Sequence, residues 1–246
     1  MKVITIMNYK GGVGKTATAI NLSYNLSEMG YNTLLIDCDP QGNVSQFFDK
    51  YDETKKSITG VLTGQYRIEK AIRRTKYKKL DIVQATKKLE LVNVLKAMEL
   101  RDQILSLDED ERYDFVICDC HPTFDTYTQC ALIAADLIIV PTKLDKNSLN
   151  GLTLFDDHFQ EVLDYNPDSE YKVLVTMFKR TKHDKDALIE LNSRYPYPIF
   201  ESVIRNSTKA DEMVKKQKPL RKFARAHGIT NDYFDLTEEL IEEVLR

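Results

Sequence analysis

The chain has 246 residues, of which 42% are hydrophobic and 30% charged, a balance typical of a globular protein that buries a substantial core without disulfides or a structural metal. No apolar run approaches the ~20 residues of a membrane-spanning helix, and the start lacks a signal-peptide pattern, so we expect a cytoplasmic protein. The net charge of −3 by itself predicts no nucleic-acid partner, but residues 171–228 contain 14 Lys or Arg against 6 Asp or Glu.

Strand-like and helix-like segments alternate along the chain. Short apolar runs, typical of buried strands, are found at 3–7, 33–36, 80–83, 114–118, 137–140, 172–177 and 199–204. Helical periodicity is found at 16–29, 57–64, 87–107, after 118 up to 135, and at 149–163, 184–194 and 232–245. This alternation predicts an α/β fold with a single doubly wound, mainly parallel sheet and helices on both faces. We expect one domain over 1–246, with no N-terminal helix-turn-helix domain because the first strand begins at once.

The strongest functional signal is the segment Lys10–Thr16, KGGVGKT, between the first strand and the first helix. Its glycines let successive backbone N–H groups point at phosphate oxygens, and the following helix adds the positive end of its dipole. Lys15 is placed to reach the β- and γ-phosphates of a nucleotide, and Thr16 to put its hydroxyl on Mg²⁺. Ala17 lacks a hydroxyl for the α-phosphate, although its N–H can still donate. This segment predicts a nucleotide-binding phosphate loop.

Two later strands end in acidic residues. The run 34–36 is followed by DCDPQGN, residues 37–43, and the apolar run 115–118 is followed by Asp119. A carboxylate at the end of a strand close to the phosphate loop can hold Mg²⁺ through a water, because Mg²⁺ gives up its waters reluctantly. We therefore expect Asp119 to hold Mg²⁺ beside the phosphate loop.

The phosphate loop departs from the general pattern, since Tyr9 replaces its first glycine and Lys10 adds a lysine before the glycine pair. Together with DPQGN at 39–43, the strand 115–120 and the segment 203–219, this loop resembles the ParA branch of the deviant Walker A ATPases, which also includes MinD and the nitrogenase iron protein. The resemblance covers nearly the whole chain. It implies a deviant P-loop NTPase fold, Mg-dependent hydrolysis of ATP to ADP and phosphate, and a homodimer in the ATP-bound state.

The same resemblance implies roles for individual residues. Asp39 would position or activate the attacking water, and Asp37 would support the magnesium shell. Lys10 would cross a dimer interface to the partner's ATP, where a cation acts like an arginine finger. The implied catalytic residues are Asp39, Lys10 and Lys15; the implied nucleotide contacts are Lys10, Gly11, Gly12, Val13, Gly14, Lys15, Thr16, Ala17 and, near the base, Arg205 and Asn206; the implied metal ligands are Thr16, Asp37 and Asp119.

The functional hypothesis is partition of a plasmid or chromosome. ATP-bound dimers would coat nucleoid DNA without sequence preference, and a ParB-type centromere-binding adaptor would trigger hydrolysis and release. Scattered basic side chains suit contacts to the phosphate backbone, which need charge but no base readout. The candidate DNA contacts are Lys179, Arg180, Lys182, Lys209, Lys215, Lys216, Lys218, Arg221, Lys222 and Arg225.

The main alternative is a MinD-like membrane-associated ATPase, which needs a basic amphipathic helix at its C-terminus. The last 18 residues instead hold six acids and a single Arg, so anionic lipid would repel them and no membrane partner is expected. A protein-cargo-positioning ATPase would share every motif and differ only in its adaptor, so this alternative remains open.

Overall fold

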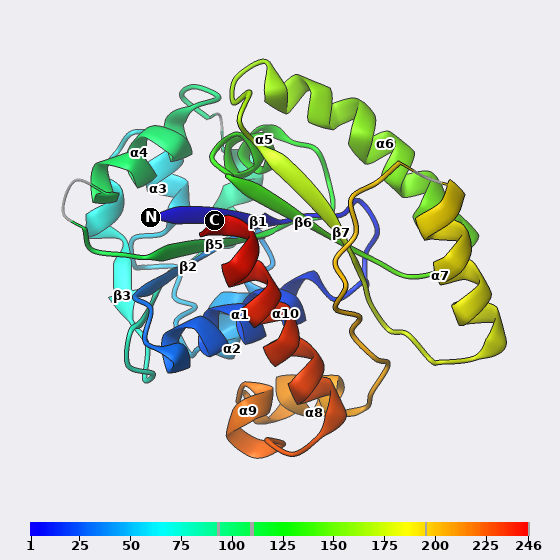
Figure 1. Cartoon of the computed structure of the whole chain (residues 1–246). Helices are drawn as coiled ribbons and strands as arrows, with labels where there is room; N and C mark the ends of the chain where they lie inside the picture. The colour runs from blue at the N-terminus through cyan, green and yellow to red at the C-terminus, as the bar shows by residue number, and fades with distance from the viewer. Residues whose placement is uncertain (93, 109–110, 195, 246) are drawn as a thin grey trace.

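The computed structural model describes residues 1–92, 94–108, 111–194 and 196–245. Its centre is a seven-stranded sheet with the order β3-β4-β2-β5-β1-β6-β7 (Figure 1). All neighbouring strands are parallel except β3 and β4, so the prediction of a mainly parallel sheet is confirmed. The strands are β1 (Lys2–Ile6), β2 (Thr33–Cys38), β3 (Ile72–Arg74), β4 (Leu80–Val83), β5 (Phe115–Cys120), β6 (Leu137–Thr142) and β7 (Glu170–Val175).

Helices cover both faces of this sheet (Figure 1). They are α1 (Lys15–Met29), α2 (Asn43–Phe47), α3 (Ile58–Leu62), α4 (Glu99–Asp108), α5 (Thr126–Ile133), α6 (Lys146–Leu163), α7 (Lys182–Arg194), α8 (Lys209–Lys216), α9 (Leu220–Phe223) and α10 (Gly228–Val244), with short 3-10 turns η1 (Ile68–Lys70) and η2 (Lys87–Leu91). None of the helices in the described ranges is long and apolar enough to cross a membrane.

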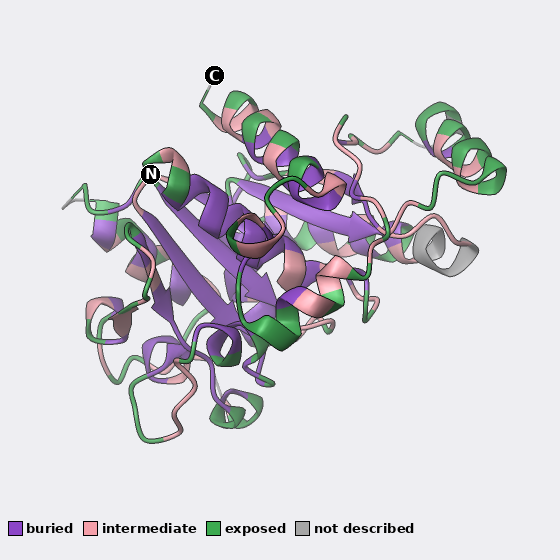
Figure 2. Cartoon of the chain, turned by 90° about the horizontal axis from the view of Figure 1, so that it is seen from below, coloured by how far each residue is buried: buried purple, intermediate pink, exposed green. Residues whose placement is uncertain are grey.

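Each central strand contributes to two apolar layers because successive side chains point to opposite faces. In β1, Ile4 and Ile6 pack in the layer that includes residues of α1 and α10, whereas Val3 packs in the layer that includes residues of α4, α5 and α6. The strands are buried almost throughout, while the outer faces of the helices are exposed (Figure 2). Burial on both faces explains why the strands read as continuous apolar runs rather than as alternating ones.

Two predicted elements are wrong. The periodic segment 87–107 is not one helix: η2 ends at Leu91, Val92 is extended, and α4 begins only at Glu99. The β-branched Val92 disfavours helix, and the chain instead turns so that Leu95 N–H donates to Leu62 O at 3.1 Å. Residue 93, within this segment, lies outside the described residues.

The segment 199–204 is not a named strand, although it runs beside β7. It makes one isolated bridge, Val173 with Ile199, and a few separate backbone hydrogen bonds to β7, such as Ile204 N to Val175 O at 2.9 Å. Pro198 has no N–H to donate, and the N–H groups of Glu201 and Ser202 donate to the Glu239 carboxylate instead of to a strand. Regular pairing therefore fails here. The short edge strand β3 was not predicted at all.

Candidate functional site

The candidate site lies at the carboxyl ends of the central strands. β1 lies between β5 and β6, and the loop Met7–Gly14 leads from β1 into α1. In open α/β sheets, ligands bind outside the carboxyl ends of the strands where the strand order reverses. Asn8 fixes the loop between these strands: its Nδ2 donates to Pro141 O at 2.8 Å, and its Oδ1 accepts from Lys10 N at 2.8 Å.

The loop has the backbone geometry of a phosphate cradle. Gly12 and Gly14 have φ angles of 68° and 95°, in the left-handed region that favours glycine. A Cβ added at Gly11, Gly12 or Gly14 would meet nothing within 4 Å, so no other group crowds the loop at these glycines. The loop and the N-terminus of α1 together can therefore receive an anionic group.

Lys15 is folded into the loop. Its Nζ donates to Asn8 O at 2.9 Å and to Lys10 O at 3.2 Å, and the side chain is only 8% exposed. Burial lowers the pKa of Lys15, and the nearby Asp119 carboxylate opposes that shift. The ammonium group is thus held by two carbonyl oxygens that a phosphate could replace.

Thr16 and Asp119 meet beside this loop. Thr16 Oγ1 donates to Asp119 Oδ2 at 2.8 Å, whereas the buried Asp119 Oδ1 has no hydrogen-bond partner. Asp37 is paired with Asp119 in the β2–β5 register, and both are fully buried. Burial raises the pKa of Asp119 well above its usual value, and the nearby charge of Asp37 raises it further. An unsatisfied carboxylate oxygen beside a threonine hydroxyl is a donor set that suits Mg²⁺.

Asp37 is already satisfied by the loop that follows β2. Ser45 donates to its Oδ2 twice, from Oγ at 2.6 Å and from N at 2.8 Å, and Asp39 N donates to its Oδ1 at 3.1 Å. Burial raises the pKa of Asp37 to about 7, although the Ser45 hydrogen bonds oppose the shift. Asp37 therefore fixes the loop that carries Asp39, with its own oxygens directed to that loop.

Asp39 lies where the β2 strand opens into this loop and is 8% exposed. Its Oδ1 accepts from Gln41 N at 2.9 Å, an Asx-type turn, and Gly42 then begins α2 with a φ of 64°. The electrostatic influence of Asp39 reaches Lys15 and Asp119. The structure thus brings the three predicted acidic residues and the loop lysine together.

Lys10 has a partner within the same chain. Its Nζ binds both carboxylate oxygens of Asp145, at 2.7 Å and 2.8 Å, and the two side chains are 31% and 45% exposed. The role of Lys10 at the partner's ATP therefore stays a prediction, and it would require Lys10 to leave Asp145. Asp145 follows β6 by three residues and could not have been matched to Lys10 from the sequence, because 135 positions separate them.

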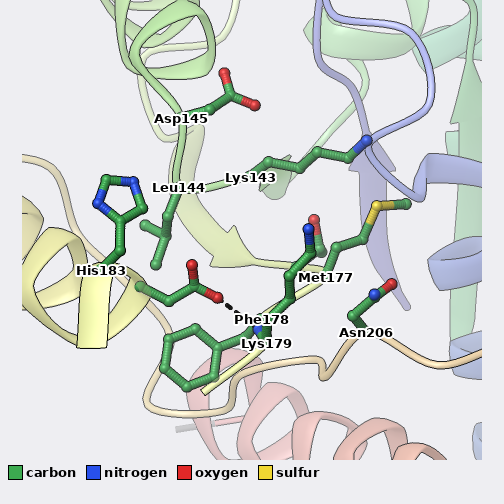
Figure 3. Close-up of a pocket in the computed structure, with 10 residues that line it drawn as sticks. Lys143, Leu144, Asp145, Met177, Phe178, Lys179, His183 and Asn206 are labelled. Atoms are coloured by element: carbon green, nitrogen blue, oxygen red, sulfur yellow. Dashed lines mark hydrogen bonds between the residues drawn. The ribbon is translucent and has the colours of Figure 1, made fainter. Parts of the chain in front are cut away.

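A pocket of about 410 Å³ adjoins this ion pair (Figure 3). Its walls come from the loops after β6 and β7, the start of α7, and Asn206. Thr176, in its lining, donates to Val13 O of the phosphate loop at 2.8 Å, so the pocket and the loop are directly connected. Asn206 lines this pocket, and Arg205 lines with Asn206 an adjoining pocket of about 280 Å³ while it makes a bidentate pair with Asp232 at 2.6 and 2.7 Å. The predicted contacts of these two residues with the base stay predictions.

The predicted DNA contacts fall into two groups in the structure. Some carry internal ion pairs: Lys209 and Lys216 both pair with Glu212, and Arg221 pairs with Glu28. The others are exposed side chains for which no ion pair is found in the described part of the chain; they are Lys179, Arg180, Lys182, Lys215, Lys218, Lys222 and Arg225. The exposed group is therefore the better candidate for phosphate contacts.

Sequence reasoning missed four residues that shape the site. Asn8 and Thr176 anchor the phosphate loop, Ser45 holds Asp37, and Asp145 holds Lys10. Ser45 lies two residues after the DPQGN run, so its proximity to that run was the available signal. The partners of the others depend on how distant strands are ordered in the sheet.

The chain is similar to known proteins in sequence and in fold. Residues 1–171 match the family model described as AAA domain. The chain is 32% identical to the chromosome partitioning protein ParA of Myxococcus xanthus, over 98% of this chain and 88% of that protein. It therefore belongs to the ParA/MinD family of P-loop ATPases.

Two solved structures also resemble the chain. A cobyrinic acid a,c-diamide synthase of Mycobacterium smegmatis, with bound ADP and magnesium, has a TM-score of 0.84 and 26% identity, over 100% of this chain and 97% of that one. A plasmid partition protein of Borrelia burgdorferi B31, bound to AMPPNP, also has a TM-score of 0.84, with 22% identity over 99% of both chains. The second likeness concerns the fold alone.

Proposed function

We propose that this chain is an ATP-dependent DNA-partition ATPase. It hydrolyses ATP to ADP and phosphate with Mg²⁺, forms a homodimer when ATP is bound, and binds duplex DNA without sequence preference. A ParB-type adaptor stimulates hydrolysis and so ends DNA binding. The observation that carries this proposal is the placement of Lys15, Thr16 and Asp119 around a phosphate loop whose glycines no other group crowds, in a chain 32% identical to a ParA over nearly its full length.

Thr16 and Asp119 are the proposed holders of Mg²⁺. The Thr16 hydroxyl and the unpartnered Asp119 Oδ1 offer the oxygen ligands that Mg²⁺ prefers. When bound, Mg²⁺ would neutralise charge on the phosphates. Asp37 supports the site indirectly, because its oxygens already accept from Ser45 and Asp39.

Hydrolysis then depends on side chains that change partners. Lys15 exchanges the carbonyl oxygens of Asn8 and Lys10 for phosphate oxygens, and Asp39 orients the attacking water. Lys10 leaves Asp145 and reaches the nucleotide of the second copy, where its charge offsets the charge that develops on the transferred phosphoryl group. The pocket lined by Asn206 receives the base.

The exposed basic residues support the DNA-binding part of the proposal. They occur on the β7–α7 connection and on the segment from α8 to just beyond α9, and their ammonium and guanidinium groups suit backbone phosphates. The last helix carries Asp232, Asp235, Glu238, Glu239, Glu242 and Glu243, so it does not provide the basic face that anchorage to anionic lipid requires.

The test is binding to random-sequence duplex DNA with ATP, with ADP and without nucleotide, across a salt series. We expect binding with ATP only, a loss of affinity as salt rises, and a longer-lived complex for Asp39→Ala, which slows hydrolysis. Lack of DNA binding by a protein that still dimerises on ATP would contradict the partition role and favour a protein-cargo-positioning ATPase. Equal DNA binding with ATP, with ADP and without nucleotide would contradict the proposed control of DNA binding by ATP.

A further inference from the structure

The turn that connects β3 and β4 presents lysines on a well-ordered scaffold. We call residues 75–79 the hairpin turn. Thr75 Oγ1 accepts from Tyr77 N at 3.0 Å and donates to Leu80 O at 2.7 Å, which fixes the turn. Lys76 and Lys78 are both exposed, and Lys76 Nζ lies 5.5 Å from the centre of the Tyr77 ring. The hairpin turn therefore projects positive charge from a rigid base.

We call residues 209–225, from α8 to just beyond α9, the C-terminal basic segment. The hairpin turn meets this segment at one side chain of α1, Tyr24. The Tyr77 and Tyr24 rings have centroids 5.1 Å apart and make an edge-to-face contact. Lys222 Nζ, from α9, lies 5.6 Å from the centre of the same Tyr24 ring. Two segments about 145 positions apart in the sequence thus flank one tyrosine.

The carboxylate within this region is already engaged. Glu28, one turn beyond Tyr24 on α1, pairs with Arg221 and accepts from Tyr24 Oη at 3.1 Å. Burial would raise the pKa of Glu28, but the hydrogen bond and charge of Arg221, with Arg225 also contributing, lower it. Because Arg221 already neutralises Glu28, the exposed basic side chains around Tyr24 retain a net positive charge.

We propose that the hairpin turn and the α9 region form one surface for the phosphate backbone of duplex DNA. We call this set the joint basic surface; it consists of Lys76, Lys78, Lys79, Lys222 and Arg225, all exposed. The inference rests on the proposed DNA binding and adds to it a contact region from residues 76–79, which the C-terminal basic segment does not include. The cations come from separate elements, an arrangement that suits spaced phosphates rather than a single anion.

The joint basic surface lies away from the nucleotide site. Lys79 O accepts from Thr33 N at 2.8 Å, which places the hairpin turn at the start of β2, opposite the strand ends that hold Asp37. Helix α1 connects the two regions, with Lys15 at its first turn and Glu28 near its last (Figure 1). At 1.5 Å per residue, this distance is roughly 20 Å. DNA on this surface would leave the phosphate loop accessible.

The test compares two matched lysine pairs in the full chain with ATP. The first variant is Lys76→Gln with Lys78→Gln. The control is Lys55→Gln with Lys56→Gln, which removes the same charge from two exposed lysines; Lys56 lies over Tyr66 much as Lys76 lies over Tyr77. Binding of fluorescent random-sequence duplex DNA is measured by anisotropy across a salt series, and thermal unfolding confirms that each variant folds.

We expect the slope of log affinity against log salt to become shallower by about 1.8 for each copy that contacts the DNA in the Lys76/Lys78 variant, since each lost phosphate contact removes about 0.9. The Lys55/Lys56 control should keep the wild-type slope. A wild-type slope in the Lys76/Lys78 variant would overturn the inference while leaving DNA binding intact. No ATP-dependent binding by the wild type would instead refute the proposed function, and the inference with it.

Discussion

At the scale of single residues, the site is built from groups that burial makes costly. Asp37 and Asp119 are fully buried neighbours, and one oxygen of Asp119 has no partner. A buried carboxylate without full hydrogen bonding lowers stability, so it is retained where a ligand will complete it. The unpartnered oxygen of Asp119, which lowers the stability of the protein without ligand, is therefore consistent with Mg²⁺ as the proposed ligand.

The first prediction follows from this unsatisfied oxygen. Asp119→Asn should raise the free energy of unfolding of the nucleotide-free protein at neutral pH by roughly 1–3 kcal/mol, because it removes a buried charge. It should also abolish Mg-dependent ATP hydrolysis. Since burial raises the folded-state pKa of Asp119, its cost to stability is complete above that raised pKa, falls as the pH drops below it, and disappears only below the ordinary Asp pKa of 3.8.

The stability gain should therefore shrink as the pH is lowered. The measurement is urea unfolding of both proteins at several pH values, with Asp168→Asn as an exposed control. A destabilised Asp119→Asn protein at neutral pH would show that Asp119 is well compensated in the free state.

The second prediction concerns the Lys10–Asp145 ion pair. Because both side chains are partly exposed, the pair contributes up to ~1 kcal/mol, or about fivefold in an equilibrium constant. Because dimerisation breaks this pair in both copies, Asp145→Asn should lower the protein concentration at which ATP causes half-maximal dimerisation by up to about 25-fold. Light scattering measures this concentration, and Asp168→Asn should leave it unchanged. A weaker dimer in Asp145→Asn would mean that Asp145 itself contributes to the interface.

At the scale of elements, strands were easier to predict than the segments between them. Six of the seven strands were recognised as apolar runs, because burial on both faces requires such runs. The helix predicted over 87–107 failed, because Val92 and the contact of Leu95 with Leu62 override a helical pattern of leucines. The edge strand β3 carries Ile72, Arg73 and Arg74 and has no such apolar signature.

The site residues also divide into those that could be proposed from the sequence and those that could not. Lys15, Thr16, Asp39 and Asp119 could be proposed from the sequence because they stand in motifs of the family that the chain resembles, and the structure brings Thr16 and Asp119 together although 103 positions separate them. Asp145 could not, because its contact with Lys10 exists only when β6 pairs with β1. Long-range strand order is a property that periodicity does not encode.

The third prediction concerns the start of α2. Gly42 has a φ of 64°, and a Cβ there would lie 2.5 Å from Tyr51 Cδ2. Gly42→Ala should therefore reduce the free energy of unfolding by about 1–3 kcal/mol, through backbone strain and this clash. Gly151→Ala offers the opposite case, since Gly151 is helical and a Cβ there meets nothing within 4 Å.

We expect Gly151→Ala to stabilise the protein by about 0.5–1 kcal/mol, because alanine loses less backbone entropy in a helix. Urea unfolding of both variants makes the comparison. Equal stability of Gly42→Ala and the wild type would show that the loop after Asp39 relaxes freely, in which case it could not hold Asp39 in one position.

At the scale of the whole molecule, the sheet separates two proposed interfaces. The phosphate loop, Lys10 and the base pocket lie at the carboxyl ends of the strands, where a second copy would face the nucleotide. The joint basic surface lies at the other end of α1. This separation would allow one molecule to hold ATP, a second copy and DNA at the same time.

In the proposed function ATP switches the association of two copies, and the mass of the protein in solution shows whether it does. Sedimentation of Asp39→Ala, the variant in which we expect slower hydrolysis, would be measured in three conditions: with Mg²⁺ and ATP, with Mg²⁺ and ADP, and without nucleotide. We predict a species of twice the 28.4 kDa chain mass with ATP and of 28.4 kDa otherwise. A mass of 28.4 kDa in all three conditions, with ATP binding demonstrated in the same sample, would contradict the account.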